Sequence, residues 1–355
     1  MKETTPVRKG EEIAADKLAE FLHDRLPVRG DLYVEQFPAG SSNLTYLVRL
    51  GDDEYVLRRP PFGNTVKSAH DMHREFSVLS KLSAVYPPAP KPLLFCDEES
   101  VIGSEFYLME RRKGLIIRGS VGGRTQAGSL RSDADLRRQV CDAFIQNLVS
   151  LHTLDYEAAG LGDLGHPDGY NRRQVEGWAK RYFAARTHGW SELENTIVWL
   201  NDNIPTESGA SLIHNDYKFD NIMLDPADLT RITAVLDWEM VTVGDPLMDL
   251  GTTLGYWISR YAGDEMMNMP FNPRVLMENI SRRELVEMYA AASGSDVSNI
   301  LFYYVFGTFK IAVIAQQIFA RYVKGLTQDE RFSGFDRFVE ALGGIAGGAI
   351  ARGSI

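Results

Sequence analysis

The stretch Leu-Ile-His-Asn-Asp-Tyr-Lys-Phe-Asp-Asn occupies residues 212–221. An apolar dipeptide opens it, and Asn221 stands five positions after Asp216. A second apolar segment, residues 232–236, runs directly into Asp237. If residues 222–224 and 232–236 form the two strands of a hairpin, Asn221 and Asp237 lie at neighbouring strand ends. Carboxylate and amide oxygens are hard ligands of the kind that Mg²⁺ binds. The pattern therefore predicts that Asn221 and Asp237 converge on one divalent ion beside Asp216.

This combination favours phosphoryl transfer from ATP, which needs a carboxylate beside the acceptor hydroxyl and oxygen ligands for Mg²⁺. The Asp-x-x-x-x-Asn spacing is the one that kinase catalytic loops use. Asp216 is the predicted catalytic base or, more modestly, the group that orients the acceptor. Asn221 and Asp237 are the predicted metal ligands. His214 belongs to the same loop, where a bracing role is favoured over proton transfer. The alternative for each residue is a turn or cap without chemistry.

Composition indicates an ordinary globular protein. The chain has 355 residues, of which 44% are hydrophobic and 24% are charged, enough to bury a large core. Its net charge of −10 argues against a nucleic-acid partner, which would need a basic surface. The two cysteines, Cys96 and Cys141, have no metal or redox spacing, which is typical of free thiols in a reducing compartment.

No membrane segment is expected. The first six residues lack the apolar core of a signal peptide. The most apolar run, residues 300–318, is interrupted by Lys310, Gln316 and Gln317. A membrane span needs about 20 mainly apolar residues, so a buried helix is the better interpretation. We therefore expect a cytoplasmic protein without a membrane partner.

The first third of the chain predicts a small antiparallel sheet with helices against it. Strand-like segments are expected at residues 33–37, 45–50, 55–58, 101–102 and 106–109, and helices at 11–26 and 68–82. The Gly51-Asp52-Asp53 turn predicts a hairpin. The prolines at positions 87, 88, 90 and 92 predict a connector.

Helical periodicity dominates after residue 133. Helices are expected at residues 136–153, 172–185, 192–203, 246–261, 282–292 and 298–322, with one strand pair at 222–224 and 232–236. Asp245 and Pro246 are the expected N-cap and first residue of one of these helices. The boundary between the two parts is expected near residues 110–114.

Three segments of the first part are candidates for nucleotide binding. Gly40, Ser41, Ser42 and Asn43 form a turn whose backbone N–H groups would cover phosphates, although a plain hairpin turn is as good an explanation. Arg58, at the end of a strand, stands where kinases carry a phosphate-binding lysine.

Glu75, in the next helix, is the natural partner of Arg58, while Arg59 competes for the same role. The third segment comprises Met109, Glu110 and Arg111, which follow a strand and would bind the adenine edge through the backbone. The alternative is that this sequence is only an edge strand that leads into a linker and binds no ligand.

Together these motifs resemble the aminoglycoside phosphotransferase and choline kinase superfamily of protein-kinase-like enzymes. The resemblance runs from about Val34 to Tyr256, and its closest branch is related to the kinase-like domain fused to acyl-CoA dehydrogenases. It implies an α+β, two-lobed fold with a small antiparallel-sheet N-lobe (residues 1–110) and a mainly helical C-lobe (residues 111–355). The short distance from Asp237 to Gly244 leaves no room for a long activation segment, so a protein substrate is not expected.

The resemblance implies an ATP- and Mg²⁺-dependent kinase that acts on a hydroxyl of a small molecule, with hydroxyacyl-CoA among the implied acceptors. Basic residues at 111–124 and 172–181 favour an anionic acceptor over a polycationic antibiotic, unless they are solvated surface. Two alternatives stay open. One is an aminoglycoside O-phosphotransferase that confers antibiotic resistance. The other is a non-catalytic nucleotide-binding module.

Overall fold

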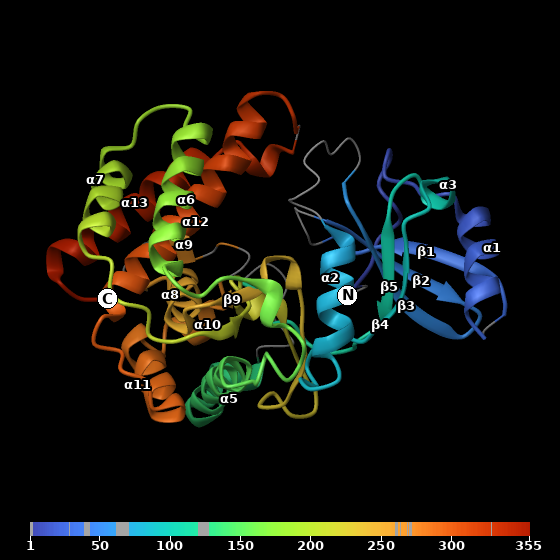
Figure 1. Cartoon of the computed structure of the whole chain (residues 1–355), viewed down its shortest axis with the longest axis horizontal. Coiled ribbons are helices and arrows are strands. Elements are labelled where there is room, and N and C mark those ends of the chain that lie inside the picture. The colour runs from blue at the N-terminus through green and yellow to red at the C-terminus, as the bar shows by residue number, and fades with distance from the viewer. Residues whose placement is uncertain are drawn as a thin grey trace. The chain divides into compact units, whose positions relative to one another are not determined.

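The computed structural model describes residues 3–27, 29–38, 43–61, 71–119, 128–259, 262, 264–267, 269, 272–327 and 329–355. The chain divides into two compact units (Figure 1). The N-terminal unit comprises residues 1–113 and 234–239, and the C-terminal unit comprises residues 114–233 and 240–355. A short internal segment that contains Asp237 therefore belongs to the N-terminal unit.

Five antiparallel strands form the sheet of the N-terminal unit, in the order β1-β2-β3-β5-β4. They are β1 (Leu32–Gln36), β2 (Leu44–Leu50), β3 (Asp53–Arg59), β4 (Pro92–Cys96) and β5 (Phe106–Glu110). Among the described residues of this unit, three helices accompany the strands: α1 (Ala15–Arg25), α2 (Met72–Leu82) and α3 (Glu99–Ile102). The predicted hairpin is confirmed, and it turns at Gly51, whose φ of 59° favours glycine.

The two faces of this sheet are covered by different helices. Successive side chains of a strand point to opposite faces, so neighbouring residues of one strand contact different helices. Leu57 and Leu108 belong to the hydrophobic core that α1 and α3 cover. Arg58 and Tyr107, one residue along each strand, lie on the other face. Figure 1 shows α2 on that side of the sheet, with α1 and α3 opposite. Strand alternation therefore brings Arg58 to the helix that carries Glu75.

Two predictions for this unit are wrong. Val101 and Ile102 form part of helix α3 rather than a strand, because their side chains reach the core from a short helical turn that ends at Gly103, with a φ of 84°. The connector predicted from the prolines at positions 87 to 92 extends too far, because strand β4 already begins at Pro92. This strand lies at the edge of the sheet, where the missing N–H of proline is tolerated.

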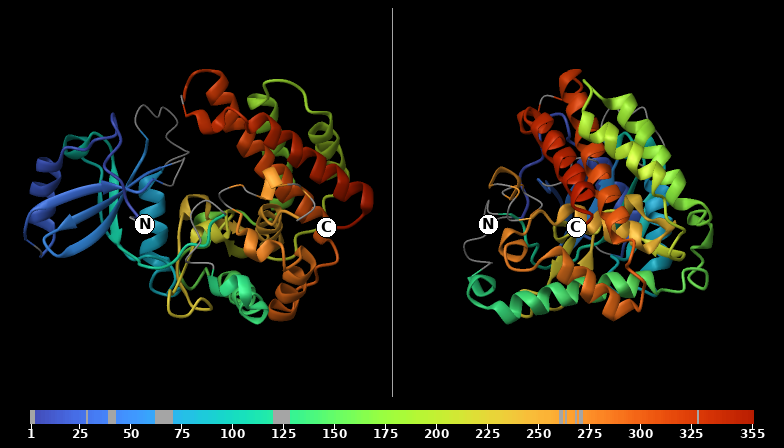
Figure 2. Two further views of the ribbon diagram at one scale, coloured as in Figure 1. Left: turned by 180° about the vertical axis from the view of Figure 1, so that it is seen from behind. Right: turned by 90° about the vertical axis from the view of Figure 1, so that its left-hand side faces the viewer.

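Helices make up most of the C-terminal unit. They are α4 (Gly128–Ser132), α5 (Ala134–His152), α6 (Tyr170–Ala185), α7 (Ser191–Asp202), α8 (Pro246–Tyr256), α9 (Asp264–Met267), α10 (Arg274–Met277), α11 (Arg282–Ser293), α12 (Ile300–Val323) and α13 (Phe335–Arg352). The six predicted helices are present, with ends shifted by a few residues, whereas α13 was not expected. Both views in Figure 2 show the orange-red helices α12 and α13 beside the yellow-green α6 and α7.

Two short strand pairs lie among these helices. Strand β6 (Ser211–Ile213) pairs with β9 (Thr242–Gly244), and β7 (Ile222–Leu224) pairs with β8 (Ile232–Val235). The predicted strand pair is therefore confirmed. Asp245 caps α8 as expected: its carboxylate accepts hydrogen bonds from the backbone of Leu247 at 2.9 Å and from the hydroxyl of Tyr303 at 2.8 Å.

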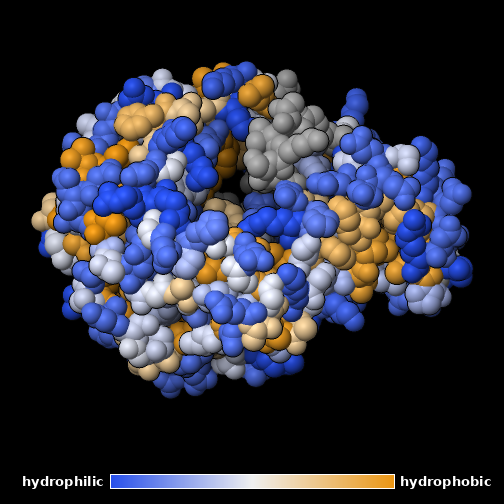
Figure 3. Space-filling model, viewed as in Figure 1, coloured by the Kyte–Doolittle hydropathy of each residue, from blue (hydrophilic) through white to orange (hydrophobic). Residues whose placement is uncertain are grey.

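Helix α12 is the central helix of the C-terminal unit. It is long and apolar enough to cross a membrane, but 78% of its most apolar window is buried inside the fold. On the face drawn in Figure 3, hydrophilic residues predominate over this unit. These observations favour the predicted core helix.

Glycines bring α12 and α8 into backbone contact. A Cβ atom added at Gly307 would lie 2.1 Å from the carbonyl oxygen of Gly251, and one added at Gly251 would lie 2.1 Å from that of Tyr303. No side chain fits between the helices at this crossing. The predicted α+β fold, with a small antiparallel sheet and a mainly helical remainder, is confirmed.

Candidate functional site

The predicted catalytic loop connects β6 to β7 within the C-terminal unit. It begins after Ile213, and its last residues form a 3₁₀ turn, Phe219–Asn221. Among the described residues, the two non-glycine residues with positive φ are Asn215, at 66°, and Asp237, at 69°. Such a conformation costs free energy and clusters at functional sites. Asn215 directly precedes Asp216, and Asp237 is one of the two predicted metal ligands.

The carboxylate of Asp216 accepts hydrogen bonds from three side chains. Lys218 Nζ lies 2.6 Å from Oδ2, Asn221 Nδ2 lies 2.9 Å from Oδ2, and the Tyr256 hydroxyl lies 2.7 Å from Oδ1. Burial alone would raise the pKa of Asp216, but Lys218 and Tyr256 outweigh it and lower that pKa. The group is therefore held as a buried carboxylate with both oxygens directed.

Asn221 is oriented by the same loop. Its Nδ2 donates to the backbone oxygen of Asp216 at 2.9 Å as well as to the carboxylate. An amide has one donor and one acceptor end, so Oδ1 is the atom that remains for a cation. The side chain is thus presented with its oxygen ligand pointing away from Asp216.

His214 is completely buried and braces the loop. Its Nδ1 accepts a hydrogen bond from the Asp216 amide at 3.2 Å. The Asp249 carboxylate, from α8, accepts the backbone N–H groups of His214 at 2.7 Å and Asn215 at 2.8 Å. His152, from α5, lies 3.2 Å from the same carboxylate. This geometry fits bracing, which is the role favoured from the sequence.

The N-terminal unit holds a second polar cluster, around Arg58, which we call the Arg58 cluster. Its guanidinium lies 2.9 Å from Asp237, 3.4 Å from Glu75 and 3.9 Å from Glu239. Burial opposes its charge, but Glu75 and Asp237 hold the pKa of Arg58 well above its usual value. The cluster joins a strand, a helix and the internal segment 234–239 around one permanent cation.

Arg59 occupies a different environment. It is buried, and it donates to the backbone oxygens of Ile102 at 2.9 Å and Pro60 at 3.2 Å. The side chain therefore braces the sheet on the side of α3. Of the two arginines considered from the sequence, Arg58 is the one placed among Glu75, Asp237 and Glu239.

The predicted phosphate-binding turn lies mainly outside the described residues, which exclude Gly40, Ser41 and Ser42. Its last member, Asn43, is buried, and its Nδ2 donates to Glu239 at 2.7 Å. Asn43 therefore contacts the Arg58 cluster through Glu239.

The predicted adenine-binding segment follows the middle of the sheet rather than its edge. Met109 is buried in β5, which lies between β3 and β4. The backbone N–H of Glu110 donates to Lys91 at 2.9 Å. Arg111 pairs with Glu3 and Glu54. The Glu110 amide is therefore already paired, and an adenine ring would have to hydrogen-bond to other backbone groups of this segment.

The predicted metal ligands Asn221 and Asp237 belong to different units, so their convergence stays a prediction. Within the described part of the chain, no group of three or more His, Cys, Asp or Glu side chains forms a ready metal site. A cation that lacks a protein cage is typical of sites that borrow ligands from substrate phosphates and water.

The basic segment that follows β5 has much of its charge paired. Arg111 and Lys113 pair with Glu54, Arg112 pairs with Glu110, and Arg118 pairs with Asp220. Arg124 lies outside the described residues. The described members therefore give less support to an anionic acceptor than their number suggests.

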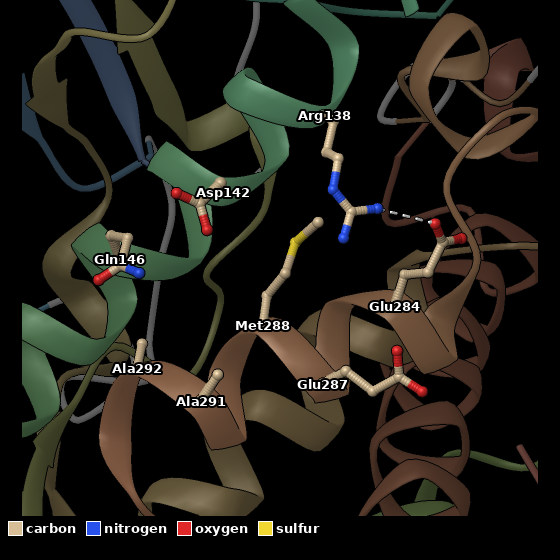
Figure 4. A pocket seen from close by; sticks show the side chains of 8 residues that line it. All are labelled: Arg138, Asp142, Gln146, Glu284, Glu287, Met288, Ala291 and Ala292. Atoms are coloured by element: carbon tan, nitrogen blue, oxygen red, sulfur yellow. Dashed lines mark hydrogen bonds and ion pairs between the residues drawn. The ribbon is translucent and has the colours of Figure 1, made fainter. Parts of the chain in front are cut away.

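A surface pocket of about 410 Å³ lies between α5 and α11. Figure 4 shows Arg138 and Asp142 from one helix opposite Glu284, Glu287 and Met288 from the other. None of its lining residues is a predicted site residue.

Three residues around Asp216 were not predicted as functional. Lys218 lies within residues 212–221, and a lysine two positions after a predicted catalytic carboxylate is itself a signal. Asp249 is an isolated acid in an apolar helix, which indicates a buried hydrogen-bonding role. Tyr256 has no local signal, because only the packing of α8 brings it to the loop.

Comparison with known proteins gives the family. Residues 34–289 match the model of the "Phosphotransferase enzyme family". Acyl-CoA dehydrogenase family member 11 of Gallus gallus is 34% identical over 352 residues, covering 96% of this chain and 44% of the relative. The chain spans less than half the length of the curated relatives it matches.

Two solved structures extend the comparison. A putative aminoglycoside phosphotransferase from Ralstonia eutropha JMP134 is 28% identical, covers 96% of this chain and 99% of its own, and has a TM-score of 0.78. A thermostable mutant of an aminoglycoside phosphotransferase, in ternary complex with ADP and hygromycin B, shares the fold at 14% identity, with coverage of 93% and 97% and a TM-score of 0.59. The resemblance seen in the motifs is confirmed, and the chain belongs to the phosphotransferase enzyme family.

Proposed function

We propose that this protein transfers the γ-phosphoryl group of ATP to a hydroxyl of a small molecule, with Mg²⁺ as cofactor. The observation that carries the proposal is the buried carboxylate of Asp216, held ionised by Lys218 and Tyr256 in a loop with a left-handed turn at Asn215. Positioning and electrostatics dominate this chemistry. A turn without function would not need three donors on one carboxylate.

Each part of the site has a proposed role. Asp216 accepts a hydrogen bond from the hydroxyl of the substrate. It takes the proton of this hydroxyl as the new O–P bond to the γ-phosphoryl group forms and the bond from that group to ADP breaks. Arg58, fixed by Glu75, contacts phosphate oxygens. Asn221 and Asp237 supply hard oxygen ligands, which fit Mg²⁺. When bound, the ion neutralises phosphate charge.

The proposed acceptor is a hydroxyacyl-CoA. Support comes from relatives named acyl-CoA dehydrogenases, in which a segment like this chain is joined to further sequence. A shared polypeptide favours a shared substrate class. The name of the Ralstonia structure favours the second candidate, an aminoglycoside.

A γ-labelled ATP screen tests these proposals. Hydroxyacyl-CoAs, aminoglycosides, amino alcohols and sugars are offered with Mg²⁺, and labelled product is separated from ATP and phosphate. Transfer to hydroxyacyl-CoA supports the proposed acceptor, and transfer to an aminoglycoside alone replaces it. Nucleotide binding without transfer to any acceptor or to water would favour the non-catalytic module instead.

Removal of divalent ions is expected to abolish transfer. Asn221 offers one amide oxygen and Asp237 one carboxylate, and the described residues of neither unit form an acidic cage that would retain an ion against a chelator. The measurement is label transfer after EDTA treatment, followed by titration with Mg²⁺. Ca²⁺ in equal excess is the control, since its larger coordination shell suits phosphates less well. Full activity in EDTA would contradict the metal assignment.

Tyr256→Phe is expected to shift the acid limb of kcat/KM to higher pH. Asp216 must be ionised to accept a proton, and hydrogen bonds to its charged form lower its pKa. Loss of the 2.7 Å bond from Tyr256 raises the pKa of Asp216, so activity is lost earlier as the pH falls. Rate profiles between pH 4 and 8 measure this shift, and Tyr322→Phe, which removes a hydroxyl that donates to Glu330, is the control. An unchanged limb would mean that Tyr256 does not tune Asp216.

A further inference from the structure

Helix α12 carries a buried ammonium group, Lys310, against the catalytic loop. The side chain is 1% exposed. Its Nζ donates to the backbone oxygen of Asn215 at 2.7 Å and to Asn215 Oδ1 at 3.2 Å, with Thr252 Oγ1 at 3.5 Å. All three partners are neutral, and among the described residues no carboxylate forms an ion pair with Lys310. A buried cation without an ion-pair partner is rare, because desolvation strongly disfavours it.

Lys310 completes a set of contacts that fixes every polar group of Asn215. The backbone N–H donates to Asp249 at 2.8 Å, and Nδ2 donates to the Met240 oxygen at 3.1 Å and to the Tyr170 hydroxyl at 3.4 Å. The two oxygen atoms of Asn215 are the ones that Lys310 binds. Asn215 has a φ of 66°, a conformation that asparagine adopts more readily than most residues, and these contacts hold it there.

The glycine crossing of α8 and α12 makes this reach possible. Gly307 lies against the backbone of Gly251, and Lys310 follows three residues later, on the same side of α12. Thr252, the residue after Gly251, is one of the partners of Lys310. A wider separation of the helices would move Nζ away from the loop.

The charges that face Lys310 come from three elements. Asp249 on α8 and Asp216 in the loop favour its protonated form, whereas Arg181 on α6 and Lys218 in the loop disfavour it. Burial is the largest influence and lowers the pKa of Lys310 to about 8. A charged side chain buried at such a site lowers stability at neutral pH, which points to a role other than holding the fold.

We propose that Lys310 is a positioning residue for phosphoryl transfer, fixing the left-handed turn at Asn215 and thereby the direction of the Asp216 carboxylate. This inference rests on the proposed function of Asp216. Lys310 acts through the loop backbone and does not contact the reacting atoms. Methionine, which matches the length of the lysine stem, removes both the donors and the charge.

Lys310→Met is expected to lower kcat by about 10²-fold, the effect of displacing a catalytic group by about 1 Å. The KM for ATP is expected to stay close to that of the wild type, and Lys310→Arg is expected to recover part of kcat. Gln316→Met on the same helix is the matched control. It removes a buried side chain that bonds to Ala185 and Trp190, away from the loop, and kcat is expected to persist.

Two readouts separate this role from simple loss of structure. Wild-type kcat is expected to fall as the pH rises through about 8, because Lys310 loses its charge there, and this limb is expected to disappear in Lys310→Met. Between pH 8 and 10.5 the unfolded chain binds more protons than the folded one. The free energy of unfolding of the wild type should therefore rise over that range relative to Lys310→Met.

Hydrogen exchange gives a test that does not need activity. Amides of residues 212–221 are expected to exchange faster in Lys310→Met than in the wild type, while those of α13 stay unchanged. Faster exchange together with lower kcat supports the proposal. If exchange is faster but the wild type transfers no phosphate, the proposed function fails while the loop contact stands. The inference is overturned if Lys310→Met shows the amide exchange rates of the wild type, or if its kcat equals that of the wild type.

Discussion

Asp216→Asn is expected to lower kcat by about 10²–10⁴-fold, the contribution of a general base. Asparagine keeps the shape of the side chain and one oxygen for the Tyr256 hydroxyl, which lies 2.7 Å from Asp216 in the wild type. It cannot take a proton from the acceptor. It also leaves Lys218, 2.6 Å from the original carboxylate, without its counter-charge. The measurement is label transfer from ATP at saturating substrate.

Asp220→Asn is the matched control for this variant. It makes the same chemical change four residues later, at a side chain that pairs with Arg118 near the surface. Surface pairs contribute little, so kcat and the melting temperature are expected to stay close to those of the wild type. Nucleotide affinity of Asp216→Asn, measured by calorimetry, shows whether the variant is folded. Wild-type kcat in a folded Asp216→Asn would end the assignment of Asp216 as the acceptor's partner.

Arg58→Met is expected to destabilise the N-terminal unit by about 3–5 kcal/mol, the range for breaking a buried ion pair, and to abolish nucleotide binding. Glu75, which is 2% exposed, would keep a carboxylate without a cation. Burial already raises the pKa of Glu75 despite Arg58, so the variant is expected to take up a proton there as it folds. Chemical denaturation and nucleotide titration measure the two effects.

A double variant separates stability from function. Arg58→Met with Glu75→Leu replaces the pair with apolar groups, which commonly restores stability. Nucleotide binding is expected to stay absent, because the phosphate contact is lost. Arg49→Met, at a surface pair with Glu35 and Glu54, is the control and is expected to cost at most about 1 kcal/mol. Recovery of nucleotide affinity in the double variant would contradict the role of Arg58.

The parts of the site that the sequence predicts are those set by local order. Asp216 and Asn221 lie in one loop, so their spacing alone places them together. The approach of Arg58 to Glu75 follows from strand alternation and from a helix that begins after a short connection. Helical periodicity likewise gave most of the helices to within a few residues.

The contacts that the sequence does not predict are made by tertiary packing. Tyr256 and Lys310 come from α8 and α12, and nothing near either residue indicates the loop. Their approach depends on a backbone contact between two glycines that are 56 positions apart. The predicted strand at Val101 and Ile102 is wrong for a related reason. Two β-branched residues favour a strand locally, but here they pack into the core from a helical turn.

The internal segment 234–239 determines how the two units can be expressed separately. Its Val235 amide donates to Pro88 at 2.9 Å, its Trp238 ring lies 5.9 Å from that of Tyr86, and its Asp237 neutralises Arg58. A fragment ending at residue 113 would lack all three contacts. No single cut of the polypeptide yields both units intact, so separate expression of the N-terminal unit requires grafting these six residues onto it through a designed linker.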